Sequence, residues 1–289
     1  MKRRWFLFLL CLCLGIGTIL YAQTHPLLFS NVTNTTDPDT LPDGDPIRCV
    51  KRGTFTYPEQ PIVDETLSEE GKALVQTIFT DIVSGTDDLQ TYLFANNNWD
   101  EARRIEDCLT QTFDDISYIF DSLSQCDKNG ILHEDHSKNT HLKITIRPSD
   151  IRKDYEQQFE TLTYANEALQ KAGITDGISE KDAIRKMVDW ICEQMTYEDE
   201  GGSAIHGFTT GTGNCNTYTL MVQDMCHEMN IPCDYISGTA DGGPHAWNRL
   251  ELDGTWYYLD TCWMDVTNNT YQMYYLAETL WSDHVADNR

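Results

Sequence analysis

The chain has 289 residues, and its 46 acidic and 21 basic side chains give a formal net charge of −25 at pH 7. That length is enough for one large domain or two ordinary ones with packed cores. Binding to nucleic acid depends on clustered Lys and Arg that displace counterions, so the charge balance argues against a nucleic-acid partner.

The first 22 residues have the pattern of an export signal. Residues 1–4 carry three basic side chains, and residues 5–22 are almost wholly apolar and uncharged. Cleavage after Ala22 is acceptable, although Leu20 is a poor residue at the −3 position. Because the apolar run is close to the shortest that spans a bilayer, an uncleaved membrane anchor is the alternative. We expect a secreted or cell-surface protein that touches a membrane only through this segment, if it is retained.

Residues 23–60 are rich in Pro, Thr and Asp and show no hydrophobic period. Such a composition cannot bury a core, so we predict a disordered acidic linker. Asn31 and Asn34 stand in glycosylation triplets, but these triplets arise often by chance.

Residues 61–147 are predicted to be a mixed, mostly helical accessory region without a catalytic grouping. Helical spacing of apolar residues predicts helices at 67–83 and 100–111, and alternation predicts strands at 116–120 and 142–146.

Asn129–Gly130 is a turn signal between those two strands. A calcium-binding loop is the alternative reading of this segment, but its frame would end at His136, which cannot act as the bidentate acid of such loops. We therefore expect no metal.

Two further helices are predicted at 149–172 and 179–195, within the region 148–289 that we expect to be the catalytic domain. Ser179 would cap the second helix, and an acid at the third helical position could complete a capping box. Gly201–Gly202 then ends the helical section.

The stretch from Gly211 to Asn230 predicts a helix that starts at a cysteine. Its apolar residues recur with helical spacing, and either Thr212 or Asn214 would cap it. Cys215 would then lie at the positive end of the helix dipole, which favours a thiolate and lowers the thiol pKa. This cysteine is the candidate nucleophile.

Asp253–Gly254 joins two strand-like runs and predicts a two-residue hairpin. Its register pairs Leu252 with Thr255, which makes His245 and Asp260 diagonal neighbours on one face of the sheet. The same register places Cys262 opposite His245. The residues before this hairpin predict a strand at 233–237 and a loop at 238–244.

A histidine held by Asp260 could take the proton of Cys215, and the resulting thiolate could attack an amide or ester carbonyl. The backbone N–H of Cys215 is the first expected oxyanion donor, and Tyr197 is a candidate for the second.

Three tryptophans lie on or near the His245 face and are candidate cleft-lining residues, with core filling as the alternative. They are Trp247, Trp256 and Trp263.

Four blocks together resemble the transglutaminase-like superfamily of papain-type cysteine enzymes: GTGNCN around Cys215, NIPCDYISG at 230–238, HAWN at 245–248 and DGTWYYLD at 253–260. The resemblance covers about residues 184–265. It implies Cys215 as nucleophile, His245 as histidine and Asp260 as third member. It also implies an α+β fold in which the helix bearing the cysteine packs on an antiparallel sheet bearing the other two.

This chain departs from the family at Cys262, where a Thr or Ser usually precedes the tryptophan. Cys262 could be a disulfide partner, a redox lock on Cys215, or a small core residue, and we favour the last.

Eight cysteines follow the export signal, and setting Cys215 aside leaves an odd number, so at least one more thiol is free or modified. Two pairs are candidate disulfides, Cys108 with Cys126 and Cys226 with Cys233. A zinc site from Cys226, His227, Cys233 and His206 matches no reliable zinc spacing.

We therefore expect an exported cysteine-dependent acyl-transfer enzyme that acts on peptide or protein amide bonds and needs no cofactor. Hydrolysis is simpler than cross-linking, which also requires a site that admits an amine. The alternative is a non-catalytic surface module that binds peptide or wall polymer. A thiol redox protein is disfavoured because no Cys-x-x-Cys occurs.

Overall fold

The computed structural model describes residues 38–94, 99–113, 115, 130–136, 139–266 and 273–287. The chain divides into two compact units, each with its own hydrophobic core. The accessory unit spans Gly53–Thr161, and the core unit joins the segment before it to the chain from Leu162 onward. The boundary therefore falls inside helix α5 (Pro148–Lys171) and not at residue 148 as predicted.

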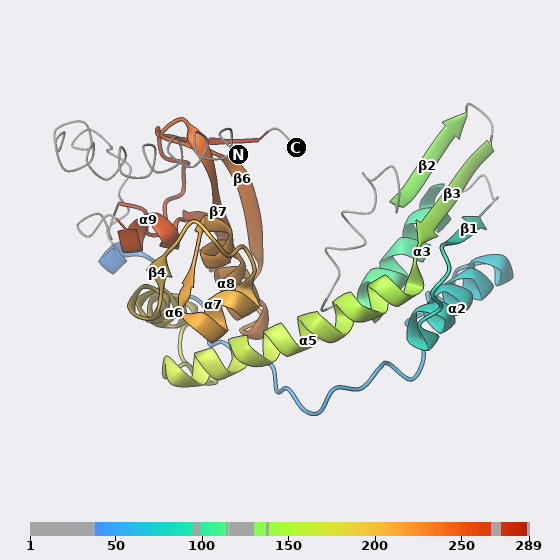
Figure 1. Ribbon diagram of the computed structural model, residues 1–289, viewed down its shortest axis with the longest axis horizontal. Helices are drawn as coiled ribbons and strands as arrows, with labels where there is room; N and C mark the ends of the chain where they lie inside the picture. Colours follow the sequence, from blue (N-terminus) through green and yellow to red (C-terminus); the bar gives the residue numbers. More distant parts are fainter. Residues whose placement is uncertain are drawn as a thin grey trace, which may run out of the picture. The chain divides into compact units, whose positions relative to one another are not determined.

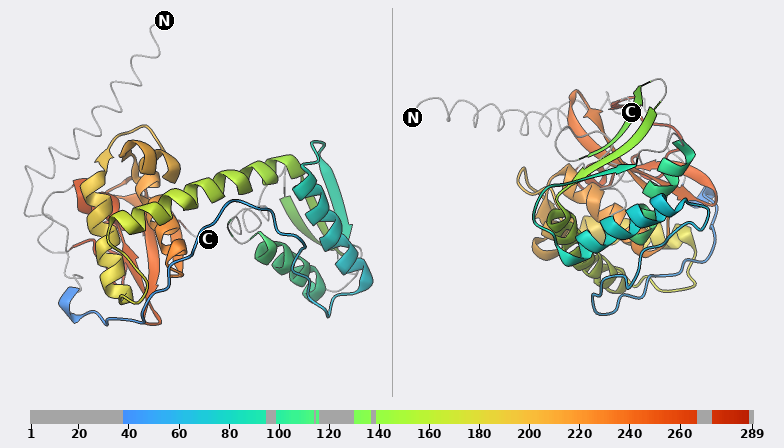
Figure 2. Two further views of the ribbon diagram at one scale, coloured as in Figure 1. Left: turned by 90° about the horizontal axis from the view of Figure 1, so that it is seen from below. Right: turned by 90° about the vertical axis from the view of Figure 1, so that its right-hand side faces the viewer.

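The accessory unit packs two helices against a three-stranded antiparallel sheet of order β1-β3-β2 (Figure 2). Its elements are α2 (Glu69–Ser84), β1 (Gln90–Phe94), α3 (Trp99–Thr112), β2 (Gly130–His136) and β3 (Asn139–Ile146). Both predicted helices are present, and α2 is capped by the Ser68 side chain, which accepts from the N–H of Gly71. The alternating apolar residues of β3 point Ile144 and Ile146 into the core.

Other expectations for the accessory unit were wrong or fall outside the description. The strand predicted at 116–120 lies outside the described residues, as does Asn129. Gly130 is the first residue of β2, which pairs with β3, so Gly130 lies in a strand and not in the predicted turn between strands at 116–120 and 142–146. Strand β1 had not been predicted, because only two of its five residues are buried and its alternation is short.

The core unit is built on a four-stranded antiparallel sheet of order β8-β7-β6-β9. Helix α8 lies against this sheet at β6 and β7 (Figure 1). The strands are β6 (Cys233–Ala240), β7 (Gly243–Leu252), β8 (Thr255–Leu259) and β9 (His284–Ala286), and the helices are α6 (Glu180–Gln194), α7 (Ala204–Thr210), α8 (Cys215–Glu228) and α9 (Thr261–Val266). The predicted α+β architecture is confirmed, with the cysteine helix packed on an antiparallel sheet.

A second hairpin replaces the loop predicted at 238–244. β6 continues to Ala240, and Ala240 pairs with Gly243 across Asp241–Gly242. Both turn residues have positive φ, 47° and 79°, which is the conformation of the two-residue turns that join antiparallel strands. The same Asp-Gly signal that revealed the Asp253–Gly254 hairpin was therefore present here as well.

Residues 38–52 belong to the core unit, which corrects the prediction of a linker up to residue 60. Leu41 and Ile47 are buried in the main hydrophobic core. Arg52 pairs with the fully buried carboxylate of Glu228 at 2.6 Å. Two buried apolar residues, Leu41 and Ile47, thus pack residues 38–52 against the core unit, although the composition of this segment is typical of a disordered chain.

A short parallel pair, β4 (Thr196–Tyr197) with β5 (Thr212–Gly213), brings the end of α6 beside the start of α8. Helix α7, which had not been predicted, lies between these strands in the chain. No helix in the described ranges is long and apolar enough to cross a membrane. The segment 1–22, predicted to be a signal or anchor, is not among the described residues.

Candidate active site

Cys215 is the first residue of α8, as predicted. The Asn214 side chain caps the helix, because its Oδ1 accepts from the backbone N–H of Asn216 at 3.1 Å and of Thr217 at 3.4 Å. The Asn214 side chain does not accept from the N–H of Cys215. The backbone N–H groups in the first turn of a helix also have no acceptor within that helix. A backbone donor is therefore available beside the sulfur.

Gly213 allows the loop before Cys215 to close on this helix. A Cβ at Gly213 would lie 2.4 Å from Oγ1 of Thr217, and its φ of 159° is one that other residues rarely adopt. The glycine requirement thus comes from the contact with the first turn of α8.

His245 and Asp260 meet at the end of the β7–β8 ladder. The predicted register is confirmed, since Leu252 pairs with Thr255 and the ladder ends at Asn248 and Leu259. Asp260 directly follows the last paired residue of β8, and its Oδ2 lies 2.8 Å from Nε2 of His245. The two side chains are only 1% and 7% exposed. A bond of this length between buried groups fixes the orientation of the imidazole.

Cys215 and His245 interact as an acid–base pair. Burial alone would raise the pKa of the Cys215 thiol, but the hydrogen bond with His245 and its positive charge outweigh burial and lower the pKa, with help from the N–H groups of Ala246 and Asn216. Burial alone would lower the pKa of His245, yet the charge of Asp260, the bond to it and the contact with Cys215 raise it to about 10. The lowered pKa of Cys215 and the raised pKa of His245 both favour a thiolate paired with an imidazolium.

Residues 168–261 match the family model of the transglutaminase-like superfamily. These residues form a transglutaminase-like domain. The match includes Cys215, His245 and Asp260 and agrees with the superfamily expected from the sequence.

Two curated relatives are the kyphoscoliosis peptidases of Homo sapiens and Mus musculus. The human protein is 25% identical over 136 residues, which are 37% of this chain and 21% of that protein. The mouse protein is 23% identical over 213 residues, 57% of this chain and 32% of that protein. The chain thus spans a third or less of these relatives' length. A solved structure of a TGase is 13% identical, covers 48% of this chain and 46% of its own, and has a TM-score of 0.33.

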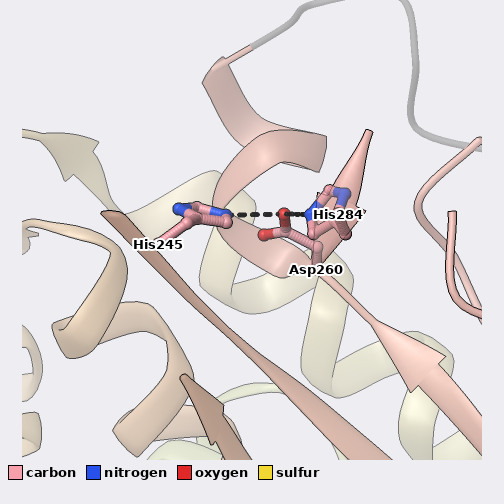
Figure 3. Close-up of side chains that lie close together, drawn as sticks. All are labelled: His245, Asp260 and His284. Carbon is pink, nitrogen blue, oxygen red and sulfur yellow. Dashed lines mark hydrogen bonds and ion pairs between the residues drawn. The ribbon is translucent and has the colours of Figure 1, made fainter. Parts of the chain in front are cut away.

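A second histidine, which lies beyond the residues that match the family model, also binds the aspartate. Nε2 of His284, in β9, lies 3.1 Å from the same Oδ2 of Asp260. Asp260 therefore stands between two imidazoles (Figure 3). Burial would raise the pKa of Asp260, but His245 and then His284 lower it to about 2. The sequence did not indicate His284, because a strand of three residues is too short to show an alternating hydrophobic pattern and no recognisable motif lies beside it.

Cys262 does not lie opposite His245, so that prediction was wrong. The chain leaves the sheet after Leu259 and begins α9 at Thr261, which places Cys262 inside the helix with 2% exposure. It is a free thiol, and burial, followed by the charge of Asp260, raises its pKa well above the ordinary value. An inert core thiol is what this environment favours.

Tyr197 and two of the three tryptophans lie at the site. Burial, then the nearby Cys262 and Cys215, raise the pKa of Tyr197 to about 12, and its side chain stays partly exposed. The rings of Trp247 and Trp263 lie 6.1 and 5.3 Å from the His245 ring.

Trp256 does not line the site, which corrects the prediction. It lies four residues before Asp260, about 13 Å along the strand, and its ring is covered by the Arg249 guanidinium at 4.5 Å. Trp247 is 1% exposed and therefore fills core. Only Trp263, which is partly buried, remains a candidate wall.

Within the described residues, one group of side chains could hold a metal ion, namely His245, Asp260 and His284, whose ligand atoms lie within 4.8 Å of one another. A metal ion bound there would replace the protons on Nε2 of His245 and of His284, which now make the hydrogen bonds to Asp260. The alternative zinc set of Cys226, His227, Cys233 and His206 does not form such a group. Cys226 and Cys233 are free thiols, and their mutual hydrogen bond raises the pKa of Cys233.

Proposed function

We propose that this protein is a cysteine-dependent acyl-transfer enzyme acting on amide bonds of peptides or proteins. Cys215 is the nucleophile, His245 the acid and base, and Asp260 the residue that holds the imidazole. The observation that carries the proposal is the Asp260–His245 bond of 2.8 Å. This bond keeps the His245 imidazole charged, and the charged imidazole lowers the pKa of the Cys215 thiol at the start of α8.

In the first half-reaction the Cys215 sulfur attacks the carbonyl carbon of the substrate amide. The negative charge that develops on the carbonyl oxygen is stabilised by the N–H of Cys215, with the Tyr197 hydroxyl as the candidate second donor. The C–N bond then breaks, and His245 gives its proton to the leaving amine. A thioester remains on Cys215.

In the second half-reaction neutral His245 removes a proton from the attacking molecule. Water gives a carboxylic acid, and a primary amine gives a new amide, while the returning proton restores the resting pair. Hydrolysis is the default, since a cross-linker must also admit an amine and exclude water. The name peptidase of the curated relatives supports this choice.

A direct test uses iodoacetamide at about pH 6, where an ordinary thiol is almost wholly protonated. We expect Cys215 to be alkylated at least about tenfold faster than the buried thiols of Cys108 and Cys262, as mapped by mass spectrometry. His245→Gln should slow the labelling of Cys215 at this pH, because the thiol then loses the imidazolium that lowers its pKa. If Cys215 reacts no faster than those thiols in the folded wild type, the ion pair and the proposed chemistry are wrong.

Two further assays separate the remaining alternatives. Peptides cleaved by the wild type but not by Cys215→Ala would establish hydrolysis, and incorporation of a dansylated amine into a glutamine-rich protein would establish transfer. A non-catalytic surface module would show neither activity, although it could bind peptides equally well with and without the Cys215 sulfur.

We further propose that the enzyme acts outside the cytosol, secreted or held at the cell surface. The proposal rests on the basic and apolar pattern of residues 1–22. Amino-terminal sequencing of the mature protein would distinguish cleavage after Ala22 from retention as an anchor.

A further inference from the structure

His284 lies between two carboxylates. Its Nδ1 is 2.7 Å from Oδ1 of Asp283, and its Nε2 is 3.1 Å from Oδ2 of Asp260. The imidazole is completely buried, and Asp260 is 1% exposed. An ionised carboxylate can only accept hydrogen bonds, so both ring nitrogens of His284 must carry a proton. His284 is therefore an imidazolium in the folded protein.

Buried neighbours support this charge. Asp283 is kept ionised, since hydrogen bonds from His284 and from the Tyr274 hydroxyl outweigh burial and lower its pKa. On β7 the facing titratable group is His245, whose ring centroid is 5.6 Å from that of His284. Strand β6 contributes Ala240, which pairs with His284 through the backbone.

The remaining walls around the His284 ring are aromatic and uncharged. The rings of Trp247, Trp263 and Trp281 lie 4.9, 4.8 and 5.0 Å from it, measured between ring centroids. The His284 side chain is 0% exposed and that of Asp283 is 18% exposed, so solvent screens the charges around this ring only weakly and each one acts strongly on its neighbours. The row from Asp283 through His284, Asp260 and His245 to Cys215 thus alternates in sign (Figure 3 shows its three central members).

We infer that His284 is a positioning residue for the Cys215–His245 pair, held protonated by Asp283 so that it fixes the Asp260 carboxylate and offsets its charge. This inference rests on the proposed acyl-transfer chemistry. Both histidines share one oxygen of Asp260, so His284 limits how strongly that carboxylate holds the His245 proton. His245 must release this proton to the leaving amine in each turnover, and a carboxylate shared with a second cation lets it do so more readily.

Two substitutions separate position from charge. His284→Gln keeps an N–H that can reach Asp260 but removes the positive charge, whereas Asp283→Asn keeps the imidazole and removes the group that holds it protonated. Losing a buried cation about 6 Å away should raise the pKa of every titrating group in the row, by about 1 to 2 pH units for His245 and less for Cys215. A purely structural role would leave these midpoints unchanged.

The test is the pH dependence of iodoacetamide labelling of Cys215 in the full chain. We expect His284→Gln to move the low-pH midpoint of labelling, where the ion pair forms, to higher pH by at least about 0.5 unit. The matched control His227→Gln removes a histidine from the opposite end of α8, about 18 Å from Cys215, and should leave the midpoint in place. Near-ultraviolet circular dichroism confirms that each variant is folded.

A second readout does not depend on the reactivity of Cys215. In wild type, nitrogen-edited NMR should show that both ring N–H protons of His284 persist above the pH at which an ordinary imidazole loses its proton, and in Asp283→Asn they should disappear at lower pH than in wild type.

The outcomes distinguish this inference from the proposed function. An unchanged midpoint in folded His284→Gln, or a His284 ring that is neutral at pH 7 in wild type, overturns the role of His284 and leaves the Cys215–His245 pair intact. A wild-type Cys215 that ionises like an ordinary thiol overturns both. If His284→Gln does not fold, the NMR titration of wild type and Asp283→Asn decides alone.

Discussion

Oδ1 of Asp260 accepts a hydrogen bond from the backbone N–H of Trp263 at 3.0 Å, so the carboxylate that holds His245 also caps α9. Its other oxygen, Oδ2, binds His245. An aspartate at the N-cap position accepting from the third helical residue is a common way to start a helix. The helix start therefore fixes the carboxylate at the point where the sheet ends.

This double role predicts the effect of Asp260→Asn. The amide oxygen can still cap α9, but its NH₂ group cannot accept the proton of His245, so the pKa of His245 falls from about 10. The active imidazolium is lost as pH rises through this pKa, so the alkaline limit of activity should move to lower pH. The rate at neutral pH should fall by about 10²- to 10⁴-fold, as for other triad aspartates.

The measurement is the rate of peptide hydrolysis, or of iodoacetamide labelling, across the pH range. Asp265→Asn is a matched control in α9, because Asp265 accepts from the Tyr218 hydroxyl and does not contact His245. An unchanged alkaline limit in Asp260→Asn would contradict the assigned role of the carboxylate.

The features that the sequence predicted correctly depend on residues close together in the chain. Asp253–Gly254 predicted the register of the β7–β8 hairpin, and that register correctly placed His245 beside Asp260. The same register failed at Cys262, because it was extended past Leu259 although Asp260 is a good N-cap residue that could have indicated α9. Sequence could not reveal β9 and His284, since their position depends on pairing with β6, about 45 residues earlier in the chain.

Gly238 controls the contact between β6 and β9. A Cβ there would lie 2.1 Å from the carbonyl oxygen of Val285 and 2.7 Å from the Trp247 ring. Gly238→Ala should therefore push β9 away and destabilise the fold by about 1 to 3 kcal/mol, the usual cost of overpacking. Urea denaturation measures this change. Gly243→Ala, in the same hairpin with its nearest atom at 3.8 Å, should cost under about 1 kcal/mol. Equal losses in both variants would show that the tight contact is relieved in solution.

The Arg52–Glu228 pair ties the amino-terminal segment to α8. The side chains are 8% and 0% exposed, and Nδ2 of Asn166 donates to the second oxygen of Glu228 at 3.0 Å. Arg52→Ala should destabilise the core unit by about 3 to 5 kcal/mol, because it leaves a buried carboxylate without its cation.

Two comparisons make this prediction specific. Arg52→Met combined with Glu228→Gln should recover most of the loss, since no uncompensated charge is then buried. Lys171→Ala breaks an exposed pair with Glu167 and should cost under about 1 kcal/mol. If Arg52→Ala is as mild as Lys171→Ala in urea denaturation, residues 38–52 are not an integral part of the core unit.

The raised pKa of His245 also predicts how stability depends on pH. An imidazole has a pKa of 6.5 in the unfolded chain and about 10 in the folded protein, so the folded state binds the extra proton between these values. This contribution is fully present below pH 6.5 and is lost as pH rises through about 10. The free energy of unfolding should therefore fall with pH across this window.

Other groups also titrate in this range, so the contribution of His245 has to be obtained as a difference. Urea denaturation of Cys215→Ala, which cannot be oxidised or alkylated at the nucleophile, is compared with that of Cys215→Ala combined with His245→Gln. The double variant should be less stable at pH 6.5. The gap should shrink as pH rises and close below pH 10, because Cys215→Ala lacks the sulfur that helps to raise the pKa of His245 and the glutamine carries no proton to lose. A gap independent of pH would mean that His245 is neutral in the folded protein, and the thiolate–imidazolium pair would then have no proton donor.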